Sequence, residues 1–485
     1  MVTRDPTGQS RKGWFAYAVS IVLLTWTILE SVWTILKTLQ DGVTTYQYPF
    51  IITGSFHDPA SFGAFIAIGL AIAVASIVRL HDKKDLFSKI QYYLSIIALL
   101  PGSIVLIVSR SRAAWVGLIV AVAFLLFRET NFKRWICKRQ VRAIVAAGII
   151  LLAGIGMFMM KKDSAIGRFH IWNMECRVIA AHPWTGVGFD KIFKAYGDVQ
   201  SAYFQQSERP ETIVRVAGSP VYAFNEYLKF GMAWGIGGLL LSIAVAAWVV
   251  WRLFRKQAVL AYGALVYALF AFASYPLSVV QLKWVGILLL AVALAPEKKR
   301  QPWCVLTIWG IALGACVFAV VRAYPAEKSR RDAERTWRSS FLLKEDTDAL
   351  IARLQPLYPS LNKNVLYLYQ YGYLLRQSGA FEESNNVLQQ GADISCDPVF
   401  HTVMAQNHID LGNDEMAEAE LLKAHWLVPG RISPLLMLMR LYADSGRTTE
   451  AVELGRTIQK MPVYENSPEM EALYGEAIEL LNELE

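Results

Sequence analysis

Charged residues are scarce in this sequence. Only 18% of the 485 residues are charged and 54% are hydrophobic, whereas soluble domains have about 25% and roughly 45–50%. Cysteine is scarce as well, and the five cysteines show no paired spacing, which argues against a disulfide framework and a zinc site. The net charge of +8 does not indicate nucleic-acid binding, because the basic residues lie in short segments between apolar runs. Composition therefore favours a membrane protein.

Long apolar runs fill the first two thirds of the chain. A membrane-spanning helix needs about 20 mostly apolar residues, and no small-residue cleavage site follows the first run, so we interpret that run as a retained helix. The seventh and eighth runs alternatively form one re-entrant hairpin, because Tyr275, Pro276 and Lys283 interrupt them. The nine predicted spans are 14–36, 61–79, 91–109, 113–127, 143–160, 232–251, 258–274, 280–296 and 303–322.

The segments between these runs alternate in charge. Short segments rich in Lys and Arg mark the cytoplasmic side of a membrane protein. The N-terminus is therefore predicted to be cytoplasmic, and nine spans place the C-terminal part on the opposite side. The five basic segments are 1–13, 80–90, 128–142, 252–257 and 297–302.

Residues 364–463 repeat with a period of about 34 residues. Each unit has a glycine, a small residue five positions later and a closing proline, which is typical of helix–turn–helix repeats such as tetratricopeptide repeats. Such repeats usually bind a protein or peptide in a concave groove. The predicted fold is all-α: a polytopic membrane domain at 1–322, a linker at 323–345 and a repeat solenoid at 346–485. The repeat positions are Gly379, Gly412 and Gly446, then Ser384, Ala417 and Ala451, then Pro398, Pro429 and Pro462.

Two segments on the predicted outer side carry unusual residues. The loop 161–231 is far longer than the roughly 15 residues beyond which loops are usually functional or disordered, and its Trp, Phe and paired Gly residues argue against disorder. Arg110 and Arg112 precede the fourth span, against the tendency of basic residues to lie inside. They either have a function or extend toward lipid phosphates.

Three blocks of residues make the interpretation more specific. Residues 54–59 (Gly-Ser-Phe-His-Asp-Pro) precede Ser-Phe-Gly at 61–63, and residues 111–115 are Ser-Arg-Ala-Ala-Trp. The third block joins Arg168, Trp172 and Pro183 to Gly-Val-Gly-Phe at 186–189. In this order and placement, across residues 50–260, the blocks resemble the O-antigen ligase and O-antigen polymerase superfamily of bacterial envelope enzymes.

The resemblance implies a glycosyltransferase of the bacterial inner membrane, with the loop and the repeats in the periplasm. Its donor would be a polyprenyl-diphosphate-linked glycan, and its acceptor lipid A core, a growing polysaccharide or a protein hydroxyl. Outer-face arginines would hold the diphosphate, since guanidinium groups bind phosphate bidentately and stabilise the departing anion. No metal or cofactor is expected. The diphosphate candidates are Arg112 and Arg168, with Arg110 and Arg215 in addition, and the supporting residues are Trp172 and Asn225.

The sequence departs from the superfamily at the end of the loop. Many members have a histidine before the asparagine here, whereas this chain has Phe224 before Asn225. Phenylalanine cannot accept a proton, so Glu226 is the first candidate for a general base, because a carboxylate shielded from water can reach a useful pKa. His170 and His182 are weaker candidates. The alternatives are a salt bridge from Glu226 to Arg215 or Lys229, and a structural role for His170.

Other functions stay open at this level. A non-enzymatic membrane scaffold that binds a protein through its repeats would also fit, as would an O-antigen polymerase. A transporter fits the number of spans, but the apolar runs show neither paired charges nor repeated half-helices. The superfamily's long outer loop usually comes after more spans than it does here, so we expect an even number of N-terminal helices to be absent.

Overall fold

The structure is a computed structural model in which every regular element of the described residues is a helix. This confirms the predicted all-α fold class. The predicted spans 143–160 and 303–322 lie outside the described residues, apart from residue 322. The described residues are 14–42, 52–56, 58–129, 162–206, 209–256, 258–295, 322, 325–342, 346–462 and 468–485.

The chain forms two compact units. The first unit holds the described parts of Met1–Lys162, Tyr222–Phe230 and Gly237–Leu306. The second unit holds the described parts of Asp163–Val221, Gly231–Ile236 and Thr307–Glu485. The predicted boundaries at 322 and 345 stay predictions.

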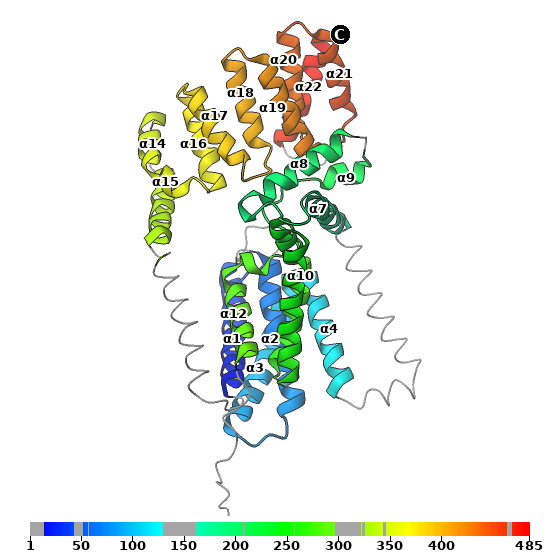
Figure 1. Cartoon of the computed structure of the whole chain (residues 1–485), viewed down its shortest axis with the longest axis vertical. Helices are drawn as coiled ribbons and strands as arrows, with labels where there is room; N and C mark the ends of the chain where they lie inside the picture. Colours follow the sequence, from blue (N-terminus) through cyan, green and yellow to red (C-terminus); the bar gives the residue numbers. More distant parts are fainter. Residues whose placement is uncertain are drawn as a thin grey trace, which may run out of the picture. The chain divides into compact units, whose positions relative to one another are not determined.

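The first unit consists of long apolar helices (Figure 1). Four helices of the described residues are long and apolar enough to cross a membrane, namely α1, α2, α3 and α10. The helices α11 and α12 are shorter, so the alternative of a re-entrant hairpin stays open. These features identify a membrane protein. The bounds are α1 (Trp14–Asp41), α2 (Pro59–Leu80), α3 (Leu86–Ser109), α4 (Arg112–Glu129), α10 (Glu226–Arg255), α11 (Leu260–Ala273), the short η2 (Pro276–Ser278) and α12 (Val280–Leu294).

Helix α2 forms the centre of the first unit, where it packs against α3, α4 and α11. Its Gly and Ala residues allow this close packing, which is how helices associate in membranes. At Gly63 an added Cβ would collide with the Ser111 side chain, and at Gly69 with Thr27. Small residues therefore fix the spacing between α2 and its neighbours.

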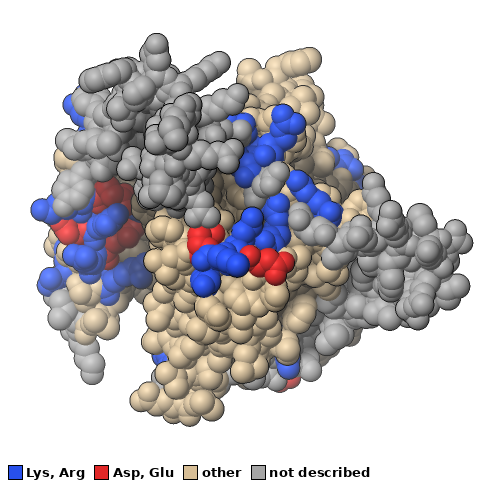
Figure 2. Space-filling model, turned by 90° about the horizontal axis from the view of Figure 1, so that it is seen from below, with Lys and Arg blue, Asp and Glu red and all other residues tan. Residues whose placement is uncertain are grey.

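The two ends of this bundle differ in charge. One end contains the last residues of α2, α4 and α10 and the first residues of α3, and Lys and Arg side chains gather there (Figure 2). The opposite end contains the starts of α2, α4 and α10 and the 274–279 connection. The difference agrees with the charge alternation of the sequence, while the orientation in the membrane stays a prediction. The basic residues are Arg79, Lys83, Lys84, Lys89, Arg128, Arg252, Arg255 and Lys256.

The second unit combines the predicted outer loop with the C-terminal part of the chain. The loop is mostly helical, with α7 (Lys162–Ala181), η1 (Phe189–Lys191), α8 (Ile192–Gln205) and α9 (Glu211–Val216). Three antiparallel helix pairs follow among the described residues, each with a glycine of positive φ between its helices. Whether these pairs are tetratricopeptide repeats stays a prediction. The pairs are α16 (Val365–Gln377) with α17 (Phe381–Ala392), α18 (Val399–Asp410) with α19 (Asp414–Leu427), and α20 (Ser433–Asp444) with α21 (Thr448–Lys460).

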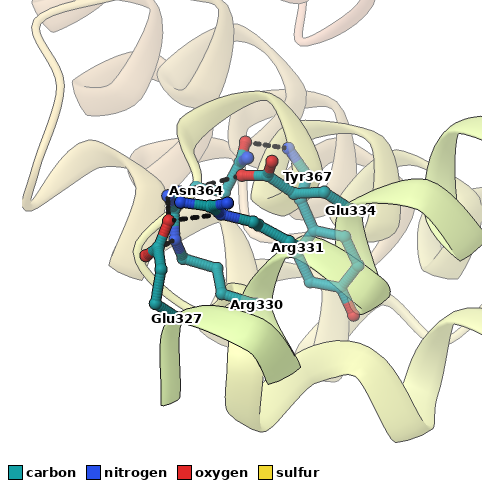
Figure 3. Close-up of polar contacts among 6 residues, drawn as sticks. All are labelled: Glu327, Arg330, Arg331, Glu334, Asn364 and Tyr367. Carbon is teal, nitrogen blue, oxygen red and sulfur yellow. Dashed lines mark hydrogen bonds and ion pairs between the residues drawn. The ribbon is translucent and has the colours of Figure 1, made fainter. Parts of the chain in front are cut away.

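Short helices precede these pairs, and one long helix follows them. Residues 325–340, which belong to the predicted linker, are helical and carry an ion-pair ladder in which Glu327 binds Arg330 and Arg331 (Figure 3). The same helix joins the first pair, because Trp337 Nε1 donates to Gln370 Oε1 at 2.9 Å. The remaining elements are α14 (Thr347–Leu354), η3 (Gln355–Leu357), α15 (Tyr358–Leu361) and α22 (Pro468–Leu484).

Candidate functional site

Asn225 begins α10 and sets the position of the residues after it. Its side chain Oδ1 accepts hydrogen bonds from the backbone N–H groups of Tyr227 at 3.0 Å and Leu228 at 3.2 Å. Such a cap satisfies donors that have no partner in the first turn of a helix. Glu226 therefore becomes the first helical residue, with its side chain inside the first unit.

Glu226 is a buried carboxylate with hydrogen-bonding capacity left. Glu226 is only 2% exposed, and its Oε1 accepts a hydrogen bond from the Leu277 N–H at 2.7 Å. Oε2 lies 3.6 Å from Lys229 Nζ and makes no hydrogen bond within the described part of the chain. Of the two salt bridges considered from the sequence, the one to Lys229 is present. An unbonded oxygen on a buried carboxylate is a frequent mark of a functional site.

The residues around Glu226 hold it between polar and aromatic groups. Lys229 Nζ donates to Ser278 Oγ at 3.2 Å, which ties the start of α10 to η2. Phe224 packs edge-on against Tyr275, with ring centroids 5.4 Å apart, and Tyr222 stacks on the same ring. Phe224, which stands where many superfamily members have a histidine, is thus part of an aromatic cluster.

A second buried carboxylate, Glu30 of α1, bonds to the loop before α2, and that loop bonds in turn to the start of α12. Glu30 Oε1 accepts from the Ser55 N–H at 2.6 Å, and the Ser55 carbonyl accepts from Gln281 Nε2 at 3.1 Å. Residues 276–281 are thus bonded to the Glu226 region and to the loop before α2. Neither Glu30 nor Gln281 was among the site residues predicted from the sequence, although a carboxylate in an apolar run is a signal.

The turn between α3 and α4 carries Arg110 and Arg112. Arg110 has a φ of 51°, a left-handed conformation that non-glycine residues seldom adopt. Ser111 Oγ donates to the Ala60 carbonyl at 3.2 Å, and its Cβ fits only because residue 63 is a glycine. Two of the sequence blocks, 61–63 and 111–115, therefore meet in space. Arg112 opens α4 and is half-buried.

The second unit holds the remaining predicted residues, mostly on α7. Arg168 is half-buried, whereas His170 is 4% exposed and its Nε2 lies 3.0 Å from Gln200 Oε1. Desolvation by burial lowers the pKa of His170, so the imidazole is neutral at pH 7. Trp172 contacts Phe169 edge-on at 5.5 Å between ring centroids.

Arg215 lies on α9, also in the second unit. It forms an ion pair with Asp163, near the start of α7, and both side chains are exposed. An exposed pair of this kind adds little stability. Arg215 nevertheless connects α9 to the helix that carries Arg168 and His170.

The paired glycines of the loop have a structural explanation. Helix α10 is interrupted at Trp234 and Gly235, where the backbone leaves helical geometry. The loop fills the break, because Val187 N–H donates to the Met232 carbonyl at 2.9 Å and Gly188 N–H to the Ala233 carbonyl at 3.0 Å. In return, Ile236 N–H donates to the Pro183 carbonyl at 2.8 Å. The positive φ angles are 64° at Gly186, 78° at Gly188 and 68° at Gly235.

The predicted site residues are therefore divided between the two compact units. The first unit contains Arg110, Arg112, Asn225 and Glu226, and the second contains Arg168, His170, Trp172 and Arg215. In the described residues, no group of three or more His, Cys, Asp or Glu side chains could hold a metal ion.

Comparison with known proteins supports the resemblance over part of the chain. A family model described as O-antigen ligase matches residues 94–243. The match includes Arg112, Arg168 and Glu226, and it ends before the C-terminal helix pairs. No curated protein matches the chain. The match supports the O-antigen ligase superfamily and a glycan-related enzyme of the bacterial envelope that acts on lipid-linked glycans.

Proposed function

We propose that this protein is a glycosyltransferase of the bacterial inner membrane, with its loop and helix pairs in the periplasm. It transfers a glycan from a polyprenyl-diphosphate-linked donor to lipid A core, a growing polysaccharide or a protein hydroxyl. The match over residues 94–243 supports this function, because the candidate arginines and the candidate base all lie within it. The proposal involves neither a metal nor a cofactor.

The arginines serve the leaving group. The bond between the anomeric carbon and the phosphate oxygen breaks, and the lipid diphosphate leaves with the electron pair. Arg112 and Arg168 bind its oxygens, since guanidinium groups stay protonated and bind phosphate in bidentate fashion. Arg110 and Arg215 are secondary candidates, and Arg215 forms an exposed ion pair with Asp163.

Glu226 serves the acceptor. The acceptor hydroxyl oxygen forms the new bond to the anomeric carbon, and its proton passes to Glu226 Oε2. The observation that carries this assignment is the unbonded Oε2 of a buried carboxylate. His170 is less suited, because burial lowers its pKa and makes the imidazole a weaker base, while Gln200 holds its Nε2–H inside the second unit. Its position supports a structural role.

The helix pairs would recruit a partner. We interpret them as tetratricopeptide repeats, on the basis of their period and of the buried small residues Ser384, Ala417 and Ala451. Repeats of this kind present a concave surface to a protein or peptide. A protein acceptor or an assembly partner would bind there.

The direct test is the Glu226→Gln variant in nanodiscs with a lipid-linked glycan donor. Glutamine keeps an oxygen for the Leu277 N–H but cannot take a proton, so transfer should fall by about 10²- to 10⁴-fold. Glu211→Gln, at an exposed position of α9 in the same loop, is the matched control and should keep the parental rate. Parental transfer by Glu226→Gln would remove the proposed base.

Phe224 favours one alternative, a scaffold without catalysis, because the residue at the histidine position cannot act on a proton. Surface glycans of cells with and without the protein separate the possibilities. Accumulated free lipid core indicates a ligase, and single-unit chains indicate a polymerase. Unchanged glycans together with loss of a bound partner protein indicate the scaffold.

A further inference from the structure

Gln200 of α8 is a buried residue with every hydrogen-bonding position occupied. It is 1% exposed. Its Oε1 accepts from Tyr196 OH at 2.8 Å and from His170 Nε2 at 3.0 Å. Its Nε2 donates to the carbonyls of Gly218 at 3.0 Å and Leu427 at 2.6 Å. An amide has two donors and two acceptor positions, so this side chain has no capacity left.

The four partners of Gln200 lie on four separate segments of the second unit. His170 belongs to α7, Tyr196 to α8 itself, and Gly218 to the segment after α9. Leu427 is the last residue of α19, and it is 227 positions from Gln200 in the chain. One side chain therefore joins the loop helices to the C-terminal helix pairs.

The side chains around Gln200 are also closely packed. Gly197 lies against Cys396 and Leu427, and an added Cβ would meet both at under 3.0 Å. Met174 of α7, Tyr196 and Cys396 form one buried apolar cluster. Helix α8 thus lies directly on the second helix pair, so the contact is a packed interface, of which Gln200 is the polar centre.

We propose that Gln200 is a positioning residue that couples the C-terminal helix pairs to the orientation of Arg168. This inference rests on the proposed function, in which Arg168 binds the donor diphosphate. Two positions on a helix are separated by about 200° around its axis, so Arg168 and His170 lie on opposite faces of α7. The bond from His170 to Gln200 fixes the rotation of α7 and thereby the direction of Arg168. The helix pairs, through the Leu427 carbonyl, hold Gln200 itself.

Hydrogen exchange of the full-length protein in nanodiscs tests the coupling without any activity. In Gln200→Glu, the carboxylate oxygen that replaces Nε2 would face the carbonyl oxygens of Gly218 and Leu427, so exchange should become about tenfold faster in α7 and in residues 427–431. Gln205→Glu, at an exposed position of the same helix, is the matched control and should exchange like the parent. Parental exchange in Gln200→Glu would overturn the inference. Should that variant fail to fold, His170→Phe removes the bond between Gln200 and α7, and unchanged exchange there would overturn it equally.

Transfer kinetics test the role in positioning. Gln200→Glu should raise KM for the lipid-linked donor by about tenfold. In an Arg168→Lys background it should add less than about twofold, because residues that act through one another are not additive. Multiplied losses would overturn the link to Arg168. Unchanged transfer by Arg168→Lys alone would instead overturn the role of Arg168, while the exchange experiment still decides whether Gln200 couples the helix pairs to α7.

Discussion

Glu226 and His170, two of the proton acceptors considered from the sequence, have different surroundings in the two units. In the first unit, Glu226 uses one oxygen on the Leu277 N–H and keeps the other near Lys229. In the second unit, His170 is bonded to a glutamine amide that has no capacity left. A general base needs an atom that can accept the proton of the substrate. The two candidates therefore differ in their surroundings: Glu226 keeps an oxygen without a hydrogen bond, whereas burial makes the imidazole of His170 a weaker base and Gln200 fixes its ring.

Among variants of the second unit, the largest effect is expected at Arg168, because it would bind the leaving diphosphate whereas His170 there has a structural role. Arg168→Ala should lower transfer about 10²- to 10³-fold, the usual result of removing one group that stabilises a developing anion. Arg215→Ala, on an arginine already paired with Asp163, should cost less than tenfold by the same reasoning. The measurement is the initial rate of glycan transfer, and equal losses in both variants would contradict the ranking.

A rescue experiment tests whether Glu226 of the first unit acts only as a general base. Phe224→His places an imidazole where many superfamily members have one, next to the Tyr275 ring. In the Glu226→Gln background it should restore transfer about tenfold, since a second general base would act at the same place. The single variant Phe224→His is the control for damage to the aromatic cluster. No recovery in the double variant would indicate that Glu226 does more than accept a proton.

The glycines at the break of α10 allow a smaller and purely structural test. At Gly235 an added Cβ would meet the Pro183 carbonyl in a backbone with φ of 68°, so Gly235→Ala should cost about 1–3 kcal/mol of unfolding free energy. Gly237→Ala is the matched control, because an added Cβ there meets nothing within 4 Å. Thermal unfolding in detergent measures both, and equal stability of the two variants would contradict the account of the break.

The smallest expected effect is a pH dependence of the stability of the helix pairs in the second unit. Burial lowers the pKa of His425 to about 4, whereas the unfolded chain has a value of roughly 6.5. Between these values the unfolded state binds more protons, so stability is complete above about pH 6.5 and declines as the pH falls toward 4. Between pH 6.5 and pH 5 the expected loss is about 1–2 kcal/mol. His425→Gln should flatten the pH dependence of Tm between 7 and 4.5, and an unchanged slope would show that other groups cause it.

Much of the fold could be predicted from apolar runs. The run 61–79 corresponds to α2 at Pro59–Leu80, and the fourth run extends to Glu129 as α4. The run 232–251 begins late, because α10 starts at Glu226, where Asn225 caps it. The break at Trp234 and Gly235 was not predicted, since it depends on hydrogen bonds from a loop about 50 residues earlier, which composition does not reveal.

Some residues of the candidate site could likewise be predicted from the sequence, whereas others could not. Glu226 could be found because a carboxylate next to an apolar run is conspicuous. Gln200 could not, because its partners include the backbone carbonyls of Gly218 and Leu427. Every residue has a carbonyl, so no residue type marks such a partner in advance. Gln281 was missed for a related reason, since its role depends on how the start of α12 lies against the loop before α2.

Helix α2 has a consequence for how the protein is made. It is the most apolar of the four candidate spans, yet its neighbours bury most of it. A helix shielded by protein has no need of such composition in the finished molecule. During synthesis, however, helices enter the bilayer singly and associate afterwards. The sequence of α2 therefore serves a stage of biogenesis in which lipid surrounds it, before α3, α4 and α11 take the place of that lipid.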